Sequence, residues 1–176
     1  MAEPQKSQTP KALAAPTKQP ILIRAQDALD KIDIGPLKGR ILEDGSNTDN
    51  RSSTAIFTLP AGQPGPPPMW HEMHDETIYV VSGRLRFHLA GGVTTDAGPG
   101  DCMVFPVRTS GTFSNASADE EAVYLIHFTP GYFIHYIRLM GQLLAEGVEL
   151  TPQLMKEAAA RYATVMDEEL AAKMRG

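Results

Sequence analysis

Residues 65–83 read GPPPMWHEMHDETIYVVSG, a proline run followed by two histidines, three carboxylates and a strand-like tail. Met69 and His71 are two residues apart, so on an extended strand their side chains face the same way. Glu76 follows five residues after His71, across a short turn that contains His74, which we expect to be exposed. An imidazole and a carboxylate that converge inside a barrel are typical of a transition-metal site. These two ligands alone do not complete a coordination sphere.

The regions on either side of this stretch predict the domain organisation. From about residue 35 to residue 128, short β-branched and aromatic runs alternate with Gly, Pro, Asn and Asp turns, which predicts antiparallel strands in one sandwich or barrel. Apolar residues then recur at helical spacing, and Leu154 to Met166 read as one helical stripe after a Thr151-Pro152 start. We expect an all-β domain at 21–130, helices at 131–176 and a disordered Pro/Lys arm at 1–20.

Composition excludes several classes of partner. The chain has 176 residues, a net charge of −5 and a pI near 5.5, whereas a nucleic-acid backbone binder needs an excess of Lys and Arg. No apolar run approaches the ~20 residues that cross a bilayer, so we expect no membrane contact. The single cysteine, Cys102, fits a reducing compartment, and residues 1–20 lack the apolar core of a signal peptide. We therefore expect a cytoplasmic protein that binds no nucleic acid.

The stretch resembles the first motif of the cupin family, in which a glycine, two histidines, a glutamate and a second glycine recur. Gly65 opens it here, His71 stands at the second histidine, Glu76 at the carboxylate, and Gly83 closes it six residues later. Met69 stands at the first histidine. The resemblance covers about residues 40–130 and is closest to the quercetinase-like branch of small single-domain cupins.

The second cupin motif is present with two departures. Gly100, Pro106 and Asn115 fit its spacing, while Arg108 replaces the motif's glycine and Gly111 replaces its histidine. The resemblance therefore implies a cupin jelly-roll β-barrel with C-terminal α-helices, and a metal site that has lost one imidazole from each motif. A methionine thioether suits Cu(I) and serves Fe(II), Mn(II) or Zn(II) poorly, and glycine offers no ligand. We expect no metal and no other cofactor.

The barrel interior then becomes a candidate pocket for a small molecule. His71 and Glu76 are the candidate acid–base pair, and Arg108 or Tyr79 is expected to steady a developing enolate or to bind a carboxylate. One further histidine, His127, is a candidate to reach the interior from its strand and to bind substrate. The remaining candidates for substrate binding are the apolar or small residues Met69, Trp70, Ile78, Phe105, Gly111 and Phe113.

Three functions remain open. The leading hypothesis is a metal-independent cupin that cyclises, isomerises or dehydrates an apolar, oxygenated, polyketide- or terpenoid-like compound of natural-product metabolism. The second is a metal-dependent dioxygenase that uses His71, Glu76 and an unusual third ligand such as His127. The third is a small-molecule-binding protein without catalytic activity. The resemblance and the apolar C-terminal helices also lead us to expect a homodimer.

Overall fold

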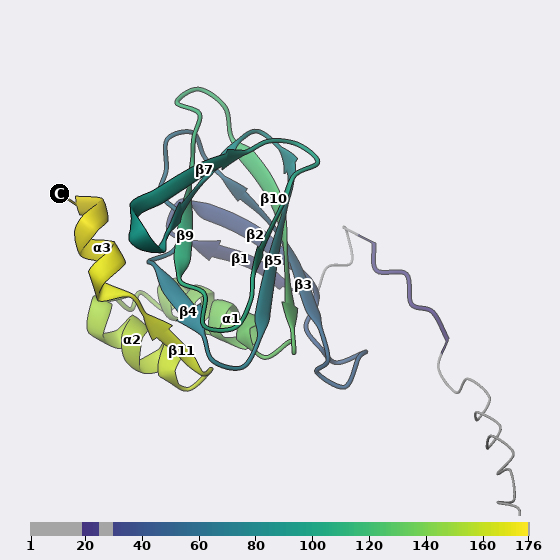
Figure 1. The fold of residues 1–176 in the computed structure, drawn as a ribbon. Helices are drawn as coiled ribbons and strands as arrows, with labels where there is room; N and C mark the ends of the chain where they lie inside the picture. Colours follow the sequence, from purple (N-terminus) through teal and green to yellow (C-terminus); the bar gives the residue numbers. More distant parts are fainter. Residues whose placement is uncertain (1–18, 25–29, 176) are drawn as a thin grey trace, which may run out of the picture.

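The computed structural model describes residues 19–24 and 30–175, so the predicted arm lies almost entirely outside the described residues. Two antiparallel sheets face one another (Figure 1). The six-stranded sheet has the order β1-β2-β3-β10-β5-β8, and the five-stranded sheet has the order β11-β4-β9-β6-β7. This confirms the predicted jelly-roll barrel. The strand bounds are β1 Asp30–Ile34, β2 Leu37–Glu43, β3 Ser53–Leu59, β4 Met69–His71, β5 Asp75–Ser82, β6 Leu85–Leu89, β7 Val93–Ala97, β8 Cys102–Phe105, β9 Gly111–Asn115, β10 Ala122–Thr129 and β11 Thr164–Met166.

Alternation along the strands places the core between the sheets. On β3 every second residue is buried, and β10 repeats the pattern, as expected for strands with one face toward a core. Phe87 of β6 and Phe113 of β9 face them from the other sheet, and Phe113 packs edge-on against Tyr124 of β10. Burial of these apolar faces provides the main favourable free energy of folding.

The C-terminal region gathers at one end of the two sheets (Figure 1). It contains α1 (Phe133–Ala145), α2 (Pro152–Ala160) and α3 (Glu168–Arg175). The predicted start of α2 is confirmed, because Thr151 Oγ1 accepts a hydrogen bond from the Leu154 amide and proline occupies the first helical position. The α1 helix buries one face against the barrel, through Phe133, Ile134, Tyr136, Ile137 and Met140.

The prediction of one helical stripe from Leu154 to Met166 was wrong. The helix α2 ends at Ala160, and Ala163 adopts a left-handed backbone conformation with φ 51°. The chain then forms β11, which pairs antiparallel with β4 and extends the five-stranded sheet. A strand thus lies inside a region that was expected to be helical throughout.

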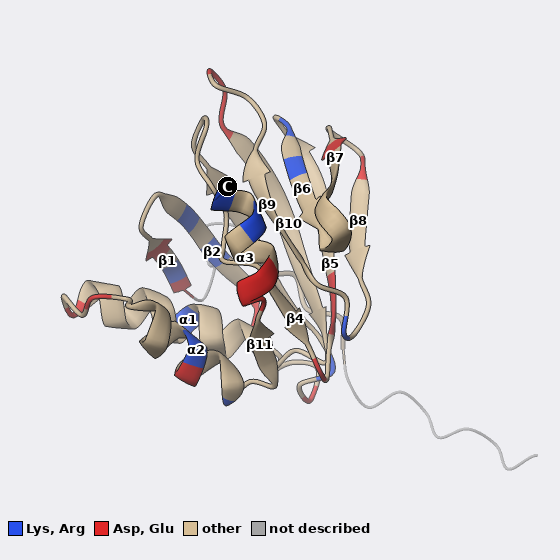
Figure 2. Cartoon of the chain, turned by 60° about the vertical axis from the view of Figure 1, so that its left-hand side comes forward, with Lys and Arg blue, Asp and Glu red and all other residues tan. Residues whose placement is uncertain are grey.

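Charged residues of both signs lie next to each other on α2 and α3 and near the ends of strands (Figure 2). Lys156 of α2 binds Glu168 of α3 at 2.6 Å, an exposed pair of the kind that stabilises little. Arg138 of α1 is more buried and donates to Asp30 and Asp44, which ties α1 to the six-stranded sheet. Within the described part of the chain, no helix has the length and apolar character of a membrane span.

Candidate functional site

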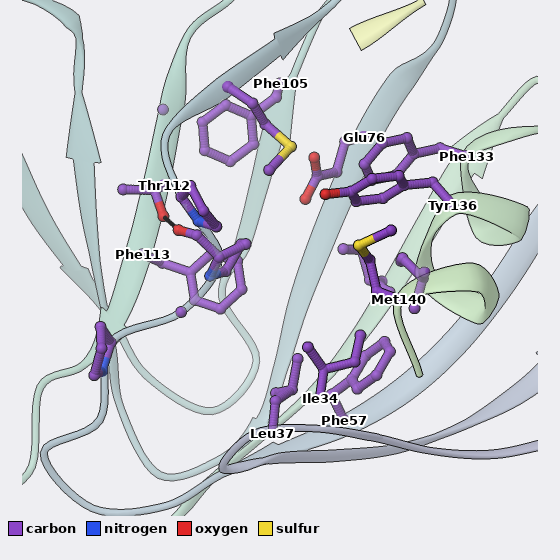
Figure 3. A pocket seen from close by; sticks show the side chains of 18 of the residues that line it. Ile34, Leu37, Phe57, Glu76, Phe105, Thr112, Phe113, Phe133, Tyr136 and Met140 are labelled. Carbon is purple, nitrogen blue, oxygen red and sulfur yellow. Dashed lines mark hydrogen bonds between the residues drawn. The ribbon is translucent and has the colours of Figure 1, made fainter. Parts of the chain in front are cut away.

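An apolar cavity of about 250 Å³ lies between the two sheets, and the C-terminal helices form one of its walls (Figure 3). Ile137 and Met140 of α1 and Met155 of α2 line it from the helical side. Phe57, Phe105 and other strand residues line it from the sheets. Among the described residues that line the cavity there is one carboxylate, Glu76, and neither lysine nor arginine.

The proline-rich segment of residues 64–67 lines part of the cavity. The Gly65 amide donates to the Phe113 carbonyl at 2.9 Å, and a Cβ at position 65 would lie 2.6 Å from the same oxygen. Only glycine allows this close approach of two backbones. The Pro66 carbonyl also accepts a hydrogen bond from Thr112 Oγ1, so the loop is fixed to β9.

His71 and Glu76 form a hydrogen-bonded pair at the cavity wall. His71 Nε2 lies 3.0 Å from Glu76 Oε2, and His71 Nδ1 lies 2.8 Å from Thr164 Oγ1. His71 belongs to β4 and Glu76 to β5, so the pair connects the two sheets across the turn between them. Both side chains are largely buried, with 4% and 13% of their surface exposed.

His74 is buried, which corrects the expectation that it is exposed. Its ring lies 3.9 Å from that of His71 and stacks on Phe133, with Phe128 edge-on. Burial, reinforced by the electrostatic interaction with the neighbouring His71 ring, lowers the pKa of His74 to about 3. The ring is therefore neutral near pH 7, and its Nε2 has no hydrogen-bond partner.

Tyr136 of α1 supplies a further polar group that the sequence reasoning missed. Its hydroxyl and the Glu76 carboxylate point toward one another across the cavity (Figure 3). Burial raises the pKa of Tyr136 to about 12, so the phenol keeps its proton at neutral pH. Tyr136 lies in the apolar helical run that follows the strands, and only the packing of α1 over the barrel shows that it faces the pair.

The two positions at which the motifs lack a histidine are direct partners in the sheet. Met69 of β4 pairs with Gly111 of β9. A Cβ on Gly111 would lie 2.4 Å from Cε1 of Phe105, so the Phe105 ring fills the space where a histidine side chain would begin. No group of three or more His, Cys, Asp or Glu residues within the described chain is arranged to hold a metal ion. The His71 imidazole and the Glu76 carboxylate hydrogen-bond to each other, and the neighbouring His74 ring is stacked on Phe133. With the Met69 thioether as the remaining donor, this set does not fit a metal.

The fold and the motif register agree with the comparison to known families. The family description "Cupin domain" matches residues 55–128. Residues 55–128 of this chain form a cupin domain. No curated protein matches the chain by sequence.

Solved structures show the same fold at low identity. KdgF from Halomonas sp. matches with a TM-score of 0.53 and 22% identity over 62% of this chain and 94% of that one. A predicted oxalate decarboxylase from Thermotoga maritima matches with a TM-score of 0.55 and 19% identity over 62% of this chain and 99% of that one. Ectoine synthase from P. lautus matches with a TM-score of 0.54 and 19% identity over 65% of this chain and 83% of that one. These likenesses establish the shared barrel.

Six of the predicted site residues line the cavity of the cupin domain, and the two residues predicted to assist catalysis do not. Tyr79 is 43% exposed, because on β5 it alternates with the buried Ile78 and Val80. The Arg108 side chain is 75% exposed and binds Glu72 at 2.8 Å outside the cavity. We therefore remove Tyr79 and Arg108 from the site. The six that line the cavity are Met69, His71, Glu76, Phe105, Gly111 and Phe113.

Three further candidates also lie elsewhere. Trp70 faces away from the cavity between its two inward neighbours on β4, and its indole donates to Glu72. Ile78 is fully buried in the core and does not line the cavity. His127 alternates with the buried residues of β10, and its Nδ1 contacts Thr54 Oγ1 at 2.9 Å on the outer face of the sheet. His127 therefore cannot act as a third ligand beside His71.

Proposed function

We propose that this cupin is an enzyme that moves a proton on a small, uncharged, apolar and oxygenated molecule without a metal. The observation that carries the proposal is the His71–Glu76 hydrogen bond at the wall of an otherwise apolar cavity. Buried acid–base pairs of this kind occur at sites of general acid–base catalysis. Cyclisation, isomerisation and dehydration of a carbonyl compound all proceed through such a proton transfer.

The lining of the cavity selects the charge of the substrate. A bound carboxylate or phosphate needs a cation or several donors to replace its water, and the described lining residues include no lysine or arginine. Aromatic and aliphatic side chains from both sheets and from α1 favour a flat or branched hydrocarbon skeleton, as in polyketide- or terpenoid-like compounds.

The pair and Tyr136 divide the chemistry between them. The pair gives a proton to the carbonyl oxygen of the substrate and takes one from the neighbouring carbon, so that a ketone becomes its enol and the pair returns to its starting state. The Tyr136 phenol, which keeps its proton, is placed on the Glu76 side of the cavity to donate a hydrogen bond to the oxygen as it gains negative charge. Reversal of the same transfers at another carbon isomerises the substrate.

The similarity to ectoine synthase from P. lautus supports only the capacity of this barrel to host an enzyme. The donor set at the cavity speaks against the metal-dependent dioxygenase. The non-catalytic binding protein is the remaining alternative, because an apolar cavity of this size also suits a receptor. Measured turnover decides between the two.

The test is hydrogen exchange on a panel of uncharged ketones and 1,3-dicarbonyl compounds with one or two rings. In D₂O, ¹H NMR follows loss of the α-proton signal with wild-type protein, His71→Asn and Glu76→Gln. We expect wild type to accelerate exchange, and each substitution to reduce the acceleration at least about 100-fold. Exchange that ignores both substitutions would refute the proposal, and saturable binding of the panel without exchange would favour the receptor.

Matched controls lie on the outer face of the barrel. Tyr79→Phe removes an exposed phenol and leaves exchange unchanged, while Tyr136→Phe removes the phenol that faces the cavity and slows it. His127→Asn is the corresponding control for His71→Asn. Equal effects within either pair would show that the losses reflect folding and not the site.

A further inference from the structure

We infer that Thr164 of β11 is a positioning residue that keeps a proton on Nδ1 of His71, so that His71 and Glu76 share a single proton between them. The inference deepens the proposed function and rests on it. It assigns a role in the site to the C-terminal region, which the cupin motifs do not include.

The direction of two hydrogen bonds carries the inference. A threonine hydroxyl has one hydrogen to donate. Thr164 Oγ1 donates it to the carbonyl of Tyr162 at 3.2 Å, and the same oxygen lies 2.8 Å from His71 Nδ1. With its hydrogen engaged, the hydroxyl oxygen can only accept from the ring. His71 therefore carries a hydrogen on Nδ1.

The hydrogen on Nδ1 determines the protonation of the contact between His71 Nε2 and Glu76. In a neutral imidazole with Nδ1–H, Nε2 is an acceptor, and an ionised carboxylate is also an acceptor. Yet Nε2 and Glu76 Oε2 are 3.0 Å apart, a hydrogen-bond distance that requires one hydrogen between them. Either His71 is an imidazolium beside a carboxylate, or Glu76 is a carboxylic acid beside an imidazole. Both forms hold the same single proton and have no net charge.

Among the described residues that line the cavity, no lysine or arginine is present to balance an ionised Glu76, and burial raises the pKa of the neighbouring Tyr124 so that its phenol stays protonated. His74, stacked on His71, is neutral near pH 7, and Tyr136, which faces Glu76, keeps its phenol proton. An ionised Glu76 with no cation would be costly to bury in this cavity. A pair without net charge avoids that cost and can begin the reaction as a proton donor.

The backbone of β11 accounts for the position of Thr164. Thr164 lies directly across from His71 in the β4–β11 register, so the two side chains lie on the same face of the sheet. The left-handed conformation of Ala163 turns the chain sharply between Tyr162 and Thr164, and the Ala163 carbonyl accepts from the Glu72 amide at 2.8 Å. A non-glycine residue held in this strained region is a common feature of functional sites.

The first test is the tautomer of His71, read from the ¹⁵N shifts of its ring nitrogens in the full-length, histidine-labelled protein near pH 7. We expect a protonated Nδ1 in wild type and in Thr164→Ser, which keeps the hydroxyl. In Thr164→Val we expect the proton to move to Nε2, where it is donated to Glu76. An unprotonated Nδ1 in wild type, or identical ring signals in Thr164→Val, would overturn the inference.

The structure offers a matched control on the outer face, where Thr54 Oγ1 contacts His127 Nδ1 at 2.9 Å. Thr54→Val should alter the signals of His127 and leave those of His71 unchanged. If Thr54→Val changed His71 as much as Thr164→Val does, the effect would be a general change of the fold and the inference would fail.

Ketone exchange supplies the second test. We expect Thr164→Val to lower the exchange rate constant between about 10- and 100-fold with little change in the concentration for half saturation, and Thr164→Ser to restore it. The two proposals fail separately. A correct tautomer in a protein that exchanges no ketone would refute the proposed function alone. Exchange that depends on His71 but is insensitive to Thr164→Val would refute the role of Thr164 alone.

Discussion

The strands β4 and β9 pair with each other in the five-stranded sheet. The strand β4 carries the histidine positions of the first cupin motif and β9 that of the second, and the two strands differ in the side chains that stand there. On β4, His71 keeps both ring nitrogens in hydrogen bonds, to Glu76 and to Thr164. On β9, Gly111 has no side chain, and the Phe105 ring covers it. The two motif positions therefore lie in unlike surroundings: an apolar half at Gly111 and Phe105, and a polar half at His71, Glu76 and Thr164.

The largest expected effect concerns His74, which is buried beside the polar half. Because its pKa is about 3 in the folded state and 6.5 ordinarily, the folded state binds fewer protons than the unfolded state between these values. The stability that this group contributes is present above pH 6.5 and is lost as the pH falls, by about 1.4 kcal/mol per unit down to pH ~3. Urea unfolding from pH 8 to pH 4 measures it.

The variant His74→Phe keeps an aromatic ring among Phe128 and Phe133 and removes the titration. We expect the difference in free energy of unfolding between wild type and variant to be constant above pH 6.5. Below pH 6.5 the variant should lose less stability than wild type as the pH falls. A constant difference across the whole range would show that His74 is not held neutral by burial.

The next effect concerns the apolar half. Gly111→Ala places a methyl group against the Phe105 ring and should lower the free energy of unfolding by about 1–3 kcal/mol. Met69→Leu, at the position paired with Gly111, should lower it by less than about 1.5 kcal/mol. In a Phe105→Leu background the cost of Gly111→Ala should shrink, because the smaller side chain leaves room. Thermal or urea unfolding of the four proteins in this cycle gives the coupling free energy. Additive effects would mean that Phe105 does not occupy the place of the lost histidine.

The smallest effect concerns Arg108, which lies outside the cavity with φ 63°, at the motif's glycine position. Arg108→Gly relieves a left-handed backbone by about 1 kcal/mol. It also loses an exposed ion pair to Glu72, which stabilises the fold little, so the net change in unfolding free energy should stay within about 1 kcal/mol. Ketone exchange should not change. A loss of exchange would return Arg108 to the site.

The sequence predicted the barrel and the motif register because alternation and spacing are local properties of a strand. The resemblance to the cupin motifs implied that Met69 and Gly111 belong to the site, and both line the cavity. It failed for His127 because β10 has apolar residues on both faces, among them Leu125 on the outer one, so alternation alone does not tell which face is inward. Tyr79 failed in the same way on β5.

Other parts of the site depend on contacts between distant segments. Thr164 meets His71 across 93 residues of sequence, and the alanine-rich chain before it reads as helix. His74 is buried because α1 brings Phe133 over the turn. Neither contact has a signal in local spacing. The expected homodimer and the natural-product substrate remain predictions.

Metal content most directly tests whether His71 and Glu76 act without a metal. The protein is purified without chelator, analysed for Fe, Ni, Cu, Mn and Zn, and titrated with Fe(II), Ni(II) and Zn(II) by calorimetry, beside His71→Asn. We expect far less than one metal per chain, and no binding that distinguishes wild type from His71→Asn. One tightly bound metal per chain that is lost in His71→Asn would contradict the metal-independent site.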